Sequence, residues 1–324
     1  MKKSISIIVF LSILAALAVT FIKPSDLIRE TEKPSEVIQE VNLQLDPASA
    51  IVPIEKLENG CEEKDCIKSI DQPQFESIDE TSNWLSDSDK VFVLSRNGES
   101  KIYPERIISW HEVVNDVISS EPIAVTFSPL SGSAIAFERK VDGITTTFGV
   151  SGKLFNSNLI LYDRYEGDLW QQFTGQGITG PAAKRGEVLN QLKLVPLSWT
   201  KAQEFFPDSV VLSRKTGFEI DYTKSPYDSY EDSADPYFET TPLDNRLHPK
   251  ARVYGIVVDG VAKAYPEQDL ISVEQKGDVV GDKNIEITNE NGVLTFRLAE
   301  SGEELPGLKS FWFAWAAFHP DTLL

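Results

Sequence analysis

Residues 91–110 read VFVLSRNGESKIYPERIISW, and residues 253–272 read VYGIVVDGVAKAYPEQDLIS. The two stretches align without a gap, so that Tyr103 falls on Tyr265 at an offset of 162 residues. In each stretch two strand-like runs flank an Asn-Gly or Asp-Gly turn, which predicts a β-hairpin. A proline then opens a short helix, expected over 104–117 in the first copy. The sequence therefore predicts an internal duplication.

A second pair of blocks aligns at a different offset. Trp199 and the later Phe-Pro-Asp-Ser match Trp312 and the later His-Pro-Asp-Thr, 113 residues further on. Because 162 exceeds 113 by 49, the first copy holds 49 residues that the second lacks, and they lie within 128–192. A duplicated scaffold needs both copies to pack, so polar groups present in only one copy are not explained by packing. We therefore expect the functional site in this insertion.

The fold class that this pattern predicts is α+β, internally duplicated, with mostly antiparallel sheet and short helices. Further strands are expected over 122–127 and 134–139. The first copy, with its insertion, is assigned to 61–220 and the shorter second copy to 251–324. An acidic connector, 221–250, joins them.

The amino terminus has the pattern of an export signal. Lys2 and Lys3 precede an apolar run over 5–22 that is just long enough to cross a bilayer. Residues 1–22 are therefore expected to be an uncleaved signal anchor or a cleaved signal peptide, with the rest of the chain outside the cytoplasm, periplasmic or at the cell surface. Residues 23–60 contain several prolines and no aromatic residue, which predicts a flexible linker.

Two cysteines, Cys61 and Cys66, enclose four residues. Outside the cytoplasm such a pair most simply forms a small disulfide. The rival interpretation is a two-thiolate metal site, which no neighbouring histidine supports.

Composition excludes several classes of function. The 324 residues carry a formal net charge of −19, which disfavours nucleic acid as a partner. Three histidines, two cysteines and one methionine are too few for a His-rich zinc site or a four-cysteine cluster. We therefore expect no cofactor and no metal, although weak calcium binding by the acidic connector stays open.

A triad-like set of catalytic candidates can be assembled from the first copy. His111 could act as a base towards Ser128 or Ser131, with Asp163 as the orienting carboxylate. The alternative is a helix histidine that caps a neighbouring loop carbonyl, and spacing alone cannot show that these residues converge.

A wider set of polar and aromatic side chains could bind a ligand. The candidates are His111, Ser131, Asn156, Asp163, Arg164 and Trp170. Each also has a structural interpretation: Asp163 and Arg164 as a brace at a strand end, Asn156 as a turn residue and Trp170 as core.

Several motifs together resemble the domain of unknown function 3179 family, from about Cys61 to Leu324. They are SWHEVVND at 109–116, SPLSGS at 128–133, FGVSG at 148–152, NSNLILYDR at 156–164, DLW at 168–170 and the closing FAWAAFHPDT. The resemblance implies an exported or membrane-tethered protein and carries over no activity. At this turn many members of the family have a sequence that resembles Cys-Pro-Leu-Cys, whereas this chain has Ser128-Pro129-Leu130-Ser131. Thiol chemistry is therefore absent from this turn, whereas a binding role through hydroxyls survives the exchange.

Three classes of function remain. The first is an extracytoplasmic domain that binds a small molecule or an envelope protein in a polar pocket of the first copy. The second is a Ser/His hydrolase, and the third is a structural cell-envelope protein.

Overall fold

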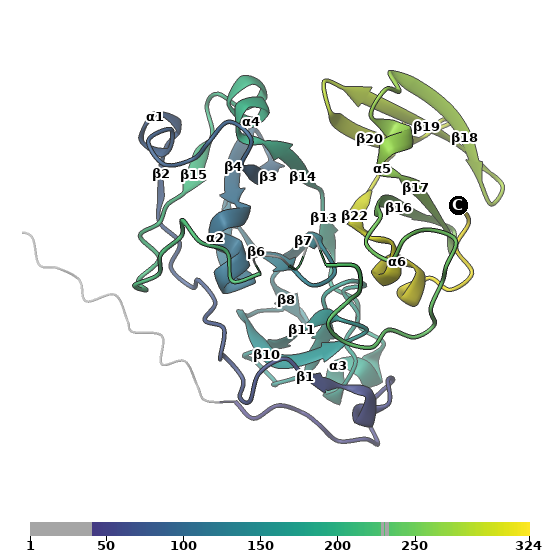
Figure 1. The fold of residues 1–324 in the computed structure, drawn as a ribbon. Helices are drawn as coiled ribbons and strands as arrows, with labels where there is room; N and C mark the ends of the chain where they lie inside the picture. Colours follow the sequence, from purple (N-terminus) through teal and green to yellow (C-terminus); the bar gives the residue numbers. More distant parts are fainter. Residues whose placement is uncertain (1–40, 228–229, 231–232) are drawn as a thin grey trace, which may run out of the picture. The chain divides into compact units, whose positions relative to one another are not determined.

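The computed structural model describes residues 41–227, 230 and 233–324 (Figure 1). The predicted α+β class is confirmed: several antiparallel sheets alternate with short helices. The predicted anchor or signal, 1–22, and the linker up to residue 40 lie outside the described residues. Within the described part, no helix is long and apolar enough to cross a membrane.

The first hairpin forms where the opening motif predicts it. β3 (Lys90–Arg96) pairs with β4 (Glu99–Pro104) through a two-residue turn. Asn97 and Gly98 in this turn both have positive φ, 48° and 82°, which suits the right-handed twist of the paired strands. α2 (Glu105–His111) begins directly after Pro104.

The helix is shorter than the predicted 104–117. It ends at His111, and Glu112 adopts the left-handed conformation with φ 56°. The Glu112 N–H donates to Ile108 O at 2.7 Å, which closes the last turn. The following β-branched pair, Val113 and Val114, then enters β5 (Val113–Ile118), because strand pairing suits these side chains better than a helix does.

The first copy completes two sheets with further short elements. These are β2 (Phe75–Ser77), α1 (Ile78–Thr81), β6 (Glu121–Ser128), β7 (Ser133–Glu138), β13 (Gln191–Leu192), β14 (Leu194–Ser198), α4 (Trp199–Phe205) and β15 (Val210–Leu212). One sheet has the order β14-β3-β4-β15-β2, and the other has the order β13-β7-β6-β5. All pairs are antiparallel except β15 with β4.

The predicted second copy, 251–324, contains strands and helices in the order found from β3 to α4 without the insertion. They are β16 (Arg252–Val258), β17 (Val261–Pro266), α5 (Glu267–Leu270), β18 (Gln275–Val280), β19 (Lys283–Glu290), β20 (Val293–Leu298), β21 (Glu304–Leu305), β22 (Leu308–Phe311) and α6 (Trp312–Phe318). Its sheets have the orders β17-β16-β22 and β18-β19-β20-β21.

Strand pairing corresponds between the two copies. β14 pairs with β3 as β22 pairs with β16, and β13 pairs with β7 as β21 pairs with β20. One ion pair recurs at the offset of 162: Lys101 with Asp116 at 3.1 Å, and Lys263 with Asp278 at 2.7 Å. These correspondences are consistent with an internal duplication, which stays a prediction from the sequence.

The insertion lies between β7 and β13, whereas only residues 299–303 separate β20 from β21. It contains β8 (Lys140–Val141), β9 (Ile144–Thr145), β10 (Phe148–Phe155), β11 (Asn158–Asp163), β12 (Leu169–Gln171) and α3 (Gly180–Arg185). With β1 (Glu58–Asn59), which follows the 3-10 turn η2 (Ile54–Lys56), it forms a sheet of order β1-β10-β11-β12. One hydrophobic core joins Trp170 of this insertion to Trp312 and Trp315 of the second copy.

The described end of the expected linker, 41–60, packs against the insertion. Gln44 N donates to Gly167 O at 2.9 Å, and Ile51 N donates to Ile178 O at 3.0 Å. Val41 and Leu43 lie against a small apolar cluster that includes Ile160. These backbone hydrogen bonds hold a segment whose composition alone predicts no structure.

Candidate functional site

The left-handed turn after α2 directs one carboxylate into the interior. Glu112 is 5% exposed, and its carbonyl accepts a hydrogen bond from Phe127 N at 2.8 Å. Its backbone is therefore fixed on both sides, by Ile108 of the helix and by β6. A left-handed conformation is uncommon for a residue with a side chain and is found where the surrounding structure enforces it.

The connector after the first copy returns to cover this carboxylate. Tyr227 Oη donates to Glu112 Oε1 at 2.7 Å, across 115 residues of sequence. Tyr230 is buried, and its hydroxyl donates to Leu130 O at 2.7 Å. Two aromatic residues of the connector thus hold it against the first copy.

A cavity of about 250 Å³ lies beside Glu112. Its apolar walls are Ile67, Pro129, Leu130, Val150, Leu154, Leu159 and Phe238, and its polar groups come from Glu112, Ser128, Lys153, Tyr227 and Tyr237. A closed apolar cavity of about 150 Å³ is enough to hold benzene, so this one has room for a molecule larger than a single ring.

Burial controls the charge of Glu112. It raises the pKa of the carboxyl from 4.5 to about 7, and the hydrogen bond from Tyr227 opposes part of this rise. The group therefore changes its charge near neutral pH, which is a property of groups that bind or exchange protons at functional sites.

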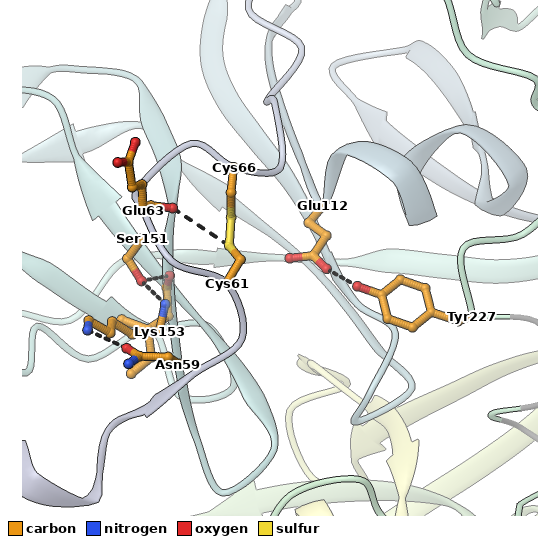
Figure 2. Close-up of a disulfide and its surroundings, with 9 residues drawn as sticks. Asn59, Cys61, Glu63, Cys66, Glu112, Ser151, Lys153 and Tyr227 are labelled. Carbon is orange, nitrogen blue, oxygen red and sulfur yellow. Dashed lines mark hydrogen bonds between the residues drawn. A yellow bond between two sulfur atoms is a disulfide. The ribbon is translucent and has the colours of Figure 1, made fainter.

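The predicted disulfide between Cys61 and Cys66 is present, and Cys61 lines the same cavity. Figure 2 shows the Glu112 carboxyl between this disulfide and the Tyr227 ring, with one oxygen directed at the Tyr227 hydroxyl. The cysteine loop is therefore one wall of the site.

A bulge in β10 receives the cysteine loop. Gly60 N donates to Gly152 O at 2.9 Å, and Asp65 N donates to Val150 O at 2.8 Å. Gly152 has φ 77°, and a Cβ there would lie 2.8 Å from Glu63 O. Only glycine suits this position, which gives the FGVSG motif a structural reason.

Of the two candidate serines, Ser128 lines the cavity and Ser131 does not. Ser128 lines the cavity, where its hydroxyl accepts from Leu159 N at 3.2 Å. Ser131 is fully buried, accepts from Asn158 Nδ2 at 2.8 Å and lies 2.8 Å from Ser133 Oγ. Ser131 therefore belongs to an interior hydrogen-bond network.

His111 is not brought to either serine. Its Nδ1 donates to Lys68 O at 2.6 Å, and its Nε2 accepts from Tyr222 Oη at 2.6 Å. Burial lowers the pKa of the ring, which favours the neutral form. Both ring nitrogens are thus engaged elsewhere, and the arrangement is the loop-carbonyl cap that was the alternative interpretation.

Asp163 and Trp170 do come together, as neighbours in the interior. Trp170 Nε1 donates to Asp163 Oδ2 at 2.8 Å, while Asp163 Oδ1 accepts from Tyr165 N and Glu166 N at 2.9 and 2.7 Å. Both side chains are fully buried. The carboxylate therefore fixes the β11–β12 turn and the indole of the core.

Arg164 and Asn156 also have structural partners. Arg164 donates to Asp71 Oδ1 at 3.1 Å and to Ser69 Oγ at 2.8 Å, so it braces the segment after the disulfide. Asn156 occupies the β10–β11 turn with φ 51°, and its side chain accepts from Thr241 N at 3.0 Å. Of the predicted site residues, only Ser128 and Cys61 line the Glu112 cavity.

The residues that sequence reasoning missed are Glu112 and Tyr227. Glu112 belongs to the SWHEVVND motif, but its neighbour His111 offered the more familiar chemistry. Tyr227 lies in the connector, for which the acidic residues suggested only calcium binding. Of those, Asp228, Glu231 and Asp232 lie outside the described residues, and the described part holds no cluster of three or more metal-ligating side chains.

Comparison with known proteins identifies one family. Residues 64–301 match the family described as "Protein of unknown function (DUF3179)". No curated protein and no solved structure matches the chain. The match covers the hairpins, the insertion and most of the second copy.

Proposed function

We propose that this chain, which belongs to the DUF3179 family, binds a small molecule in the Glu112 cavity and acts outside the cytoplasm. The description of the family names no activity. The observation that carries the proposal is a carboxyl buried beside a cavity of about 250 Å³ in the first copy. Packing does not require a carboxyl at such a place, because its burial costs free energy.

The lining defines the class of ligand. Mostly apolar walls favour a hydrocarbon or aromatic body, and the Glu112–Tyr227 pair lies at one polar position. Tyr227 occupies Oε1, which leaves Oε2 to accept a hydrogen bond from a ligand. We therefore expect a small apolar molecule that carries one donor, of which an amine pairs best with a carboxylate.

Three probes of the same size and different polarity test this. Benzylamine, benzyl alcohol and toluene should raise the thermal unfolding temperature of the protein in that order at pH 8. In Glu112→Gln the advantage of benzylamine should disappear, whereas Glu290→Gln, an exposed control, should keep it. Equal responses to all three probes, or an unchanged order in Glu112→Gln, would refute the proposal.

The location is the second part of the proposal. The apolar run at 5–22 and the disulfide both suit a protein tethered at the outer side of a membrane. If the anchor is retained, the full chain should stay with membranes after high-salt and carbonate washing. Recovery of a soluble form that starts near Val19 would show that the segment is cleaved.

The hydrolase alternative lacks its key contact, since both nitrogens of His111 are hydrogen-bonded to groups other than serine. A structural role in the envelope is the alternative that failure of the ligand experiment would favour.

A further inference from the structure

A second, larger cavity is lined by both copies. It has a volume of about 430 Å³ and takes residues from β3, β14 and α4 of the first copy and from β16 and β22 of the second. The Glu112 cavity shares no lining residue with it. Any function of the larger cavity is therefore independent of the function proposed above.

Basic side chains predominate in this cavity, which is unusual in a chain of net charge −19. Its charged lining residues are Lys90, Lys201, Arg252 and Lys309, with Glu105 and Glu267. Four positive charges against two negative ones leave an excess of two. The cavity is thus a local positive region on an acidic protein, which would attract anions.

The two walls present matching charges. At the offset of 162, Lys90 corresponds to Arg252 and Glu105 corresponds to Glu267. Lys90 lies 3.5 Å from Glu105 in the first copy. Each copy thus contributes a cation and a carboxylate, and the Tyr-Pro-Glu motif supplies the carboxylate in both.

Two further lysines add to the positive charge. Lys309 of β22 pairs with Glu267, and its side chain is only 25% exposed. Burial lowers the pKa of Lys309, and the nearby charges of Arg252 and Lys90 lower it further, while Glu267 opposes this. Lys309, Arg252 and Lys90 therefore lie close enough in this cavity for their charges to interact.

Lys201 extends from the first copy towards the second. It belongs to α4, yet its Nζ lies so close to Gly292 of the β19–β20 turn that a Cβ there would meet it. Aromatic rings of Phe92, Phe127 and Tyr254 also line the cavity. The cations of the two copies thus line one cavity whose surface is partly apolar.

From this arrangement we propose that the cavity binds a small organic or inorganic anion with at least two acidic groups, held between the cations of the two copies. One acidic group could neutralise the cations of one wall only. A ligand with two or more can join Lys90 and Lys201 on one side to Arg252 and Lys309 on the other. Carboxylates and phosphates share this chemistry.

The experiment measures binding of citrate and pyrophosphate to the full-length protein by thermal shift and titration calorimetry, with sodium chloride and acetate at equal ionic strength for comparison. Citrate, pyrophosphate or both should stabilise the protein saturably, and whichever binds more tightly identifies the acid group. A response equal to that of chloride at the same ionic strength would overturn the proposal.

Two variants locate the site. Arg252→Gln and Lys201→Gln should each weaken the Kd at least about tenfold, since each removes a charge-assisted contact. Lys184→Gln, on the exposed side of α3, is the matched control and should keep the wild-type Kd. If Arg252→Gln fails to fold, Lys201→Gln decides, because it removes a partly exposed helix side chain. Wild-type affinity in Lys201→Gln, or equal weakening in Lys184→Gln, contradicts the site.

Glu112→Gln separates the two proposals. It should abolish the preference for benzylamine and leave the Kd for citrate unchanged. A loss of citrate binding in Glu112→Gln would show that the anion does not bind between the two copies.

Discussion

Glu112 shows how the backbone conformation of one residue determines its chemistry. Had α2 continued, its side chain would follow the helix surface; the left-handed turn places it beside Tyr227 and the disulfide instead. The same turn buries the carboxyl and raises its pKa to about 7. The free-energy cost of burying the ionised Glu112 carboxyl should therefore appear in the pH dependence of the protein's stability.

Replacement of this carboxyl should stabilise the protein at high pH. The unfolded carboxyl titrates near 4.5 and the folded one near 7, so the wild type loses stability as pH rises between these values and no further above them. Glu112→Gln avoids this loss and should gain up to about 3 kcal/mol at pH 8 and little at pH 4.5. Urea unfolding at both pH values measures the gain, with Glu290→Gln as control. An equal effect at the two pH values would mean that Glu112 is not buried as described.

At the scale of elements, two residues of the predicted ligand set, Arg164 and His111, connect neighbouring elements. Arg164 links the sheet of the insertion to the segment that follows Cys66, and His111 links α2 to Lys68 and Tyr222. Arg164 of the insertion and His111 of α2 thus have packing roles that a comparison of the two aligned stretches does not reveal.

Removal of the Arg164 side chain should lower the free energy of unfolding more than removal of a surface arginine. The Arg164 side chain is 10% exposed, and Arg164→Ala removes its charge-assisted hydrogen bonds to Asp71 and Ser69. Asp71 keeps hydrogen bonds from Ser69 and Asn115, so the loss should lower the free energy of unfolding by about 2 kcal/mol. Arg185, 31% exposed, is the matched control, and Arg185→Ala should cost under about 1 kcal/mol. Urea unfolding measures both, and hydrogen exchange should rise over 61–71 only in Arg164→Ala. Equal costs would show that Arg164 does not brace this segment.

Elements that depend on adjacent residues could be predicted from the sequence. Features that depend on contacts between residues far apart in the chain could not. The Asn97-Gly98 turn and the strands at β6 and β7 were predictable from their own residues. The end of α2 was not, because nothing around Glu112 resembles a usual left-handed cap such as glycine. The Glu112–Tyr227 pair spans 115 residues and has no local signal at all.

At the scale of the whole molecule, the two predicted copies have the same order of strands and helices around their first hairpin. Tyr103 and Tyr265 are both buried, each in a hydrophobic cluster of its own copy. In the cavity proposed to bind an anion, Glu105 pairs with Lys90 and Glu267 pairs with Lys309, so each glutamate holds one of the cations in place.

Truncation of either tyrosine should therefore have a similar effect. Tyr103→Ala and Tyr265→Ala should each cost about 3 kcal/mol, since each removes a buried ring. Thermal and urea unfolding of the two variants side by side measures this. If only one of them is destabilised, the two positions do not carry equivalent packing roles.

The most direct measurement is an NMR titration of the Glu112 carboxyl carbon, assigned by its disappearance in Glu112→Gln. We predict a pKa near 7 in the free protein, and a clear fall when benzylamine is added, because an ammonium group favours the carboxylate. A pKa near 4.5 that benzylamine leaves unchanged would contradict both the burial of Glu112 and its role in binding.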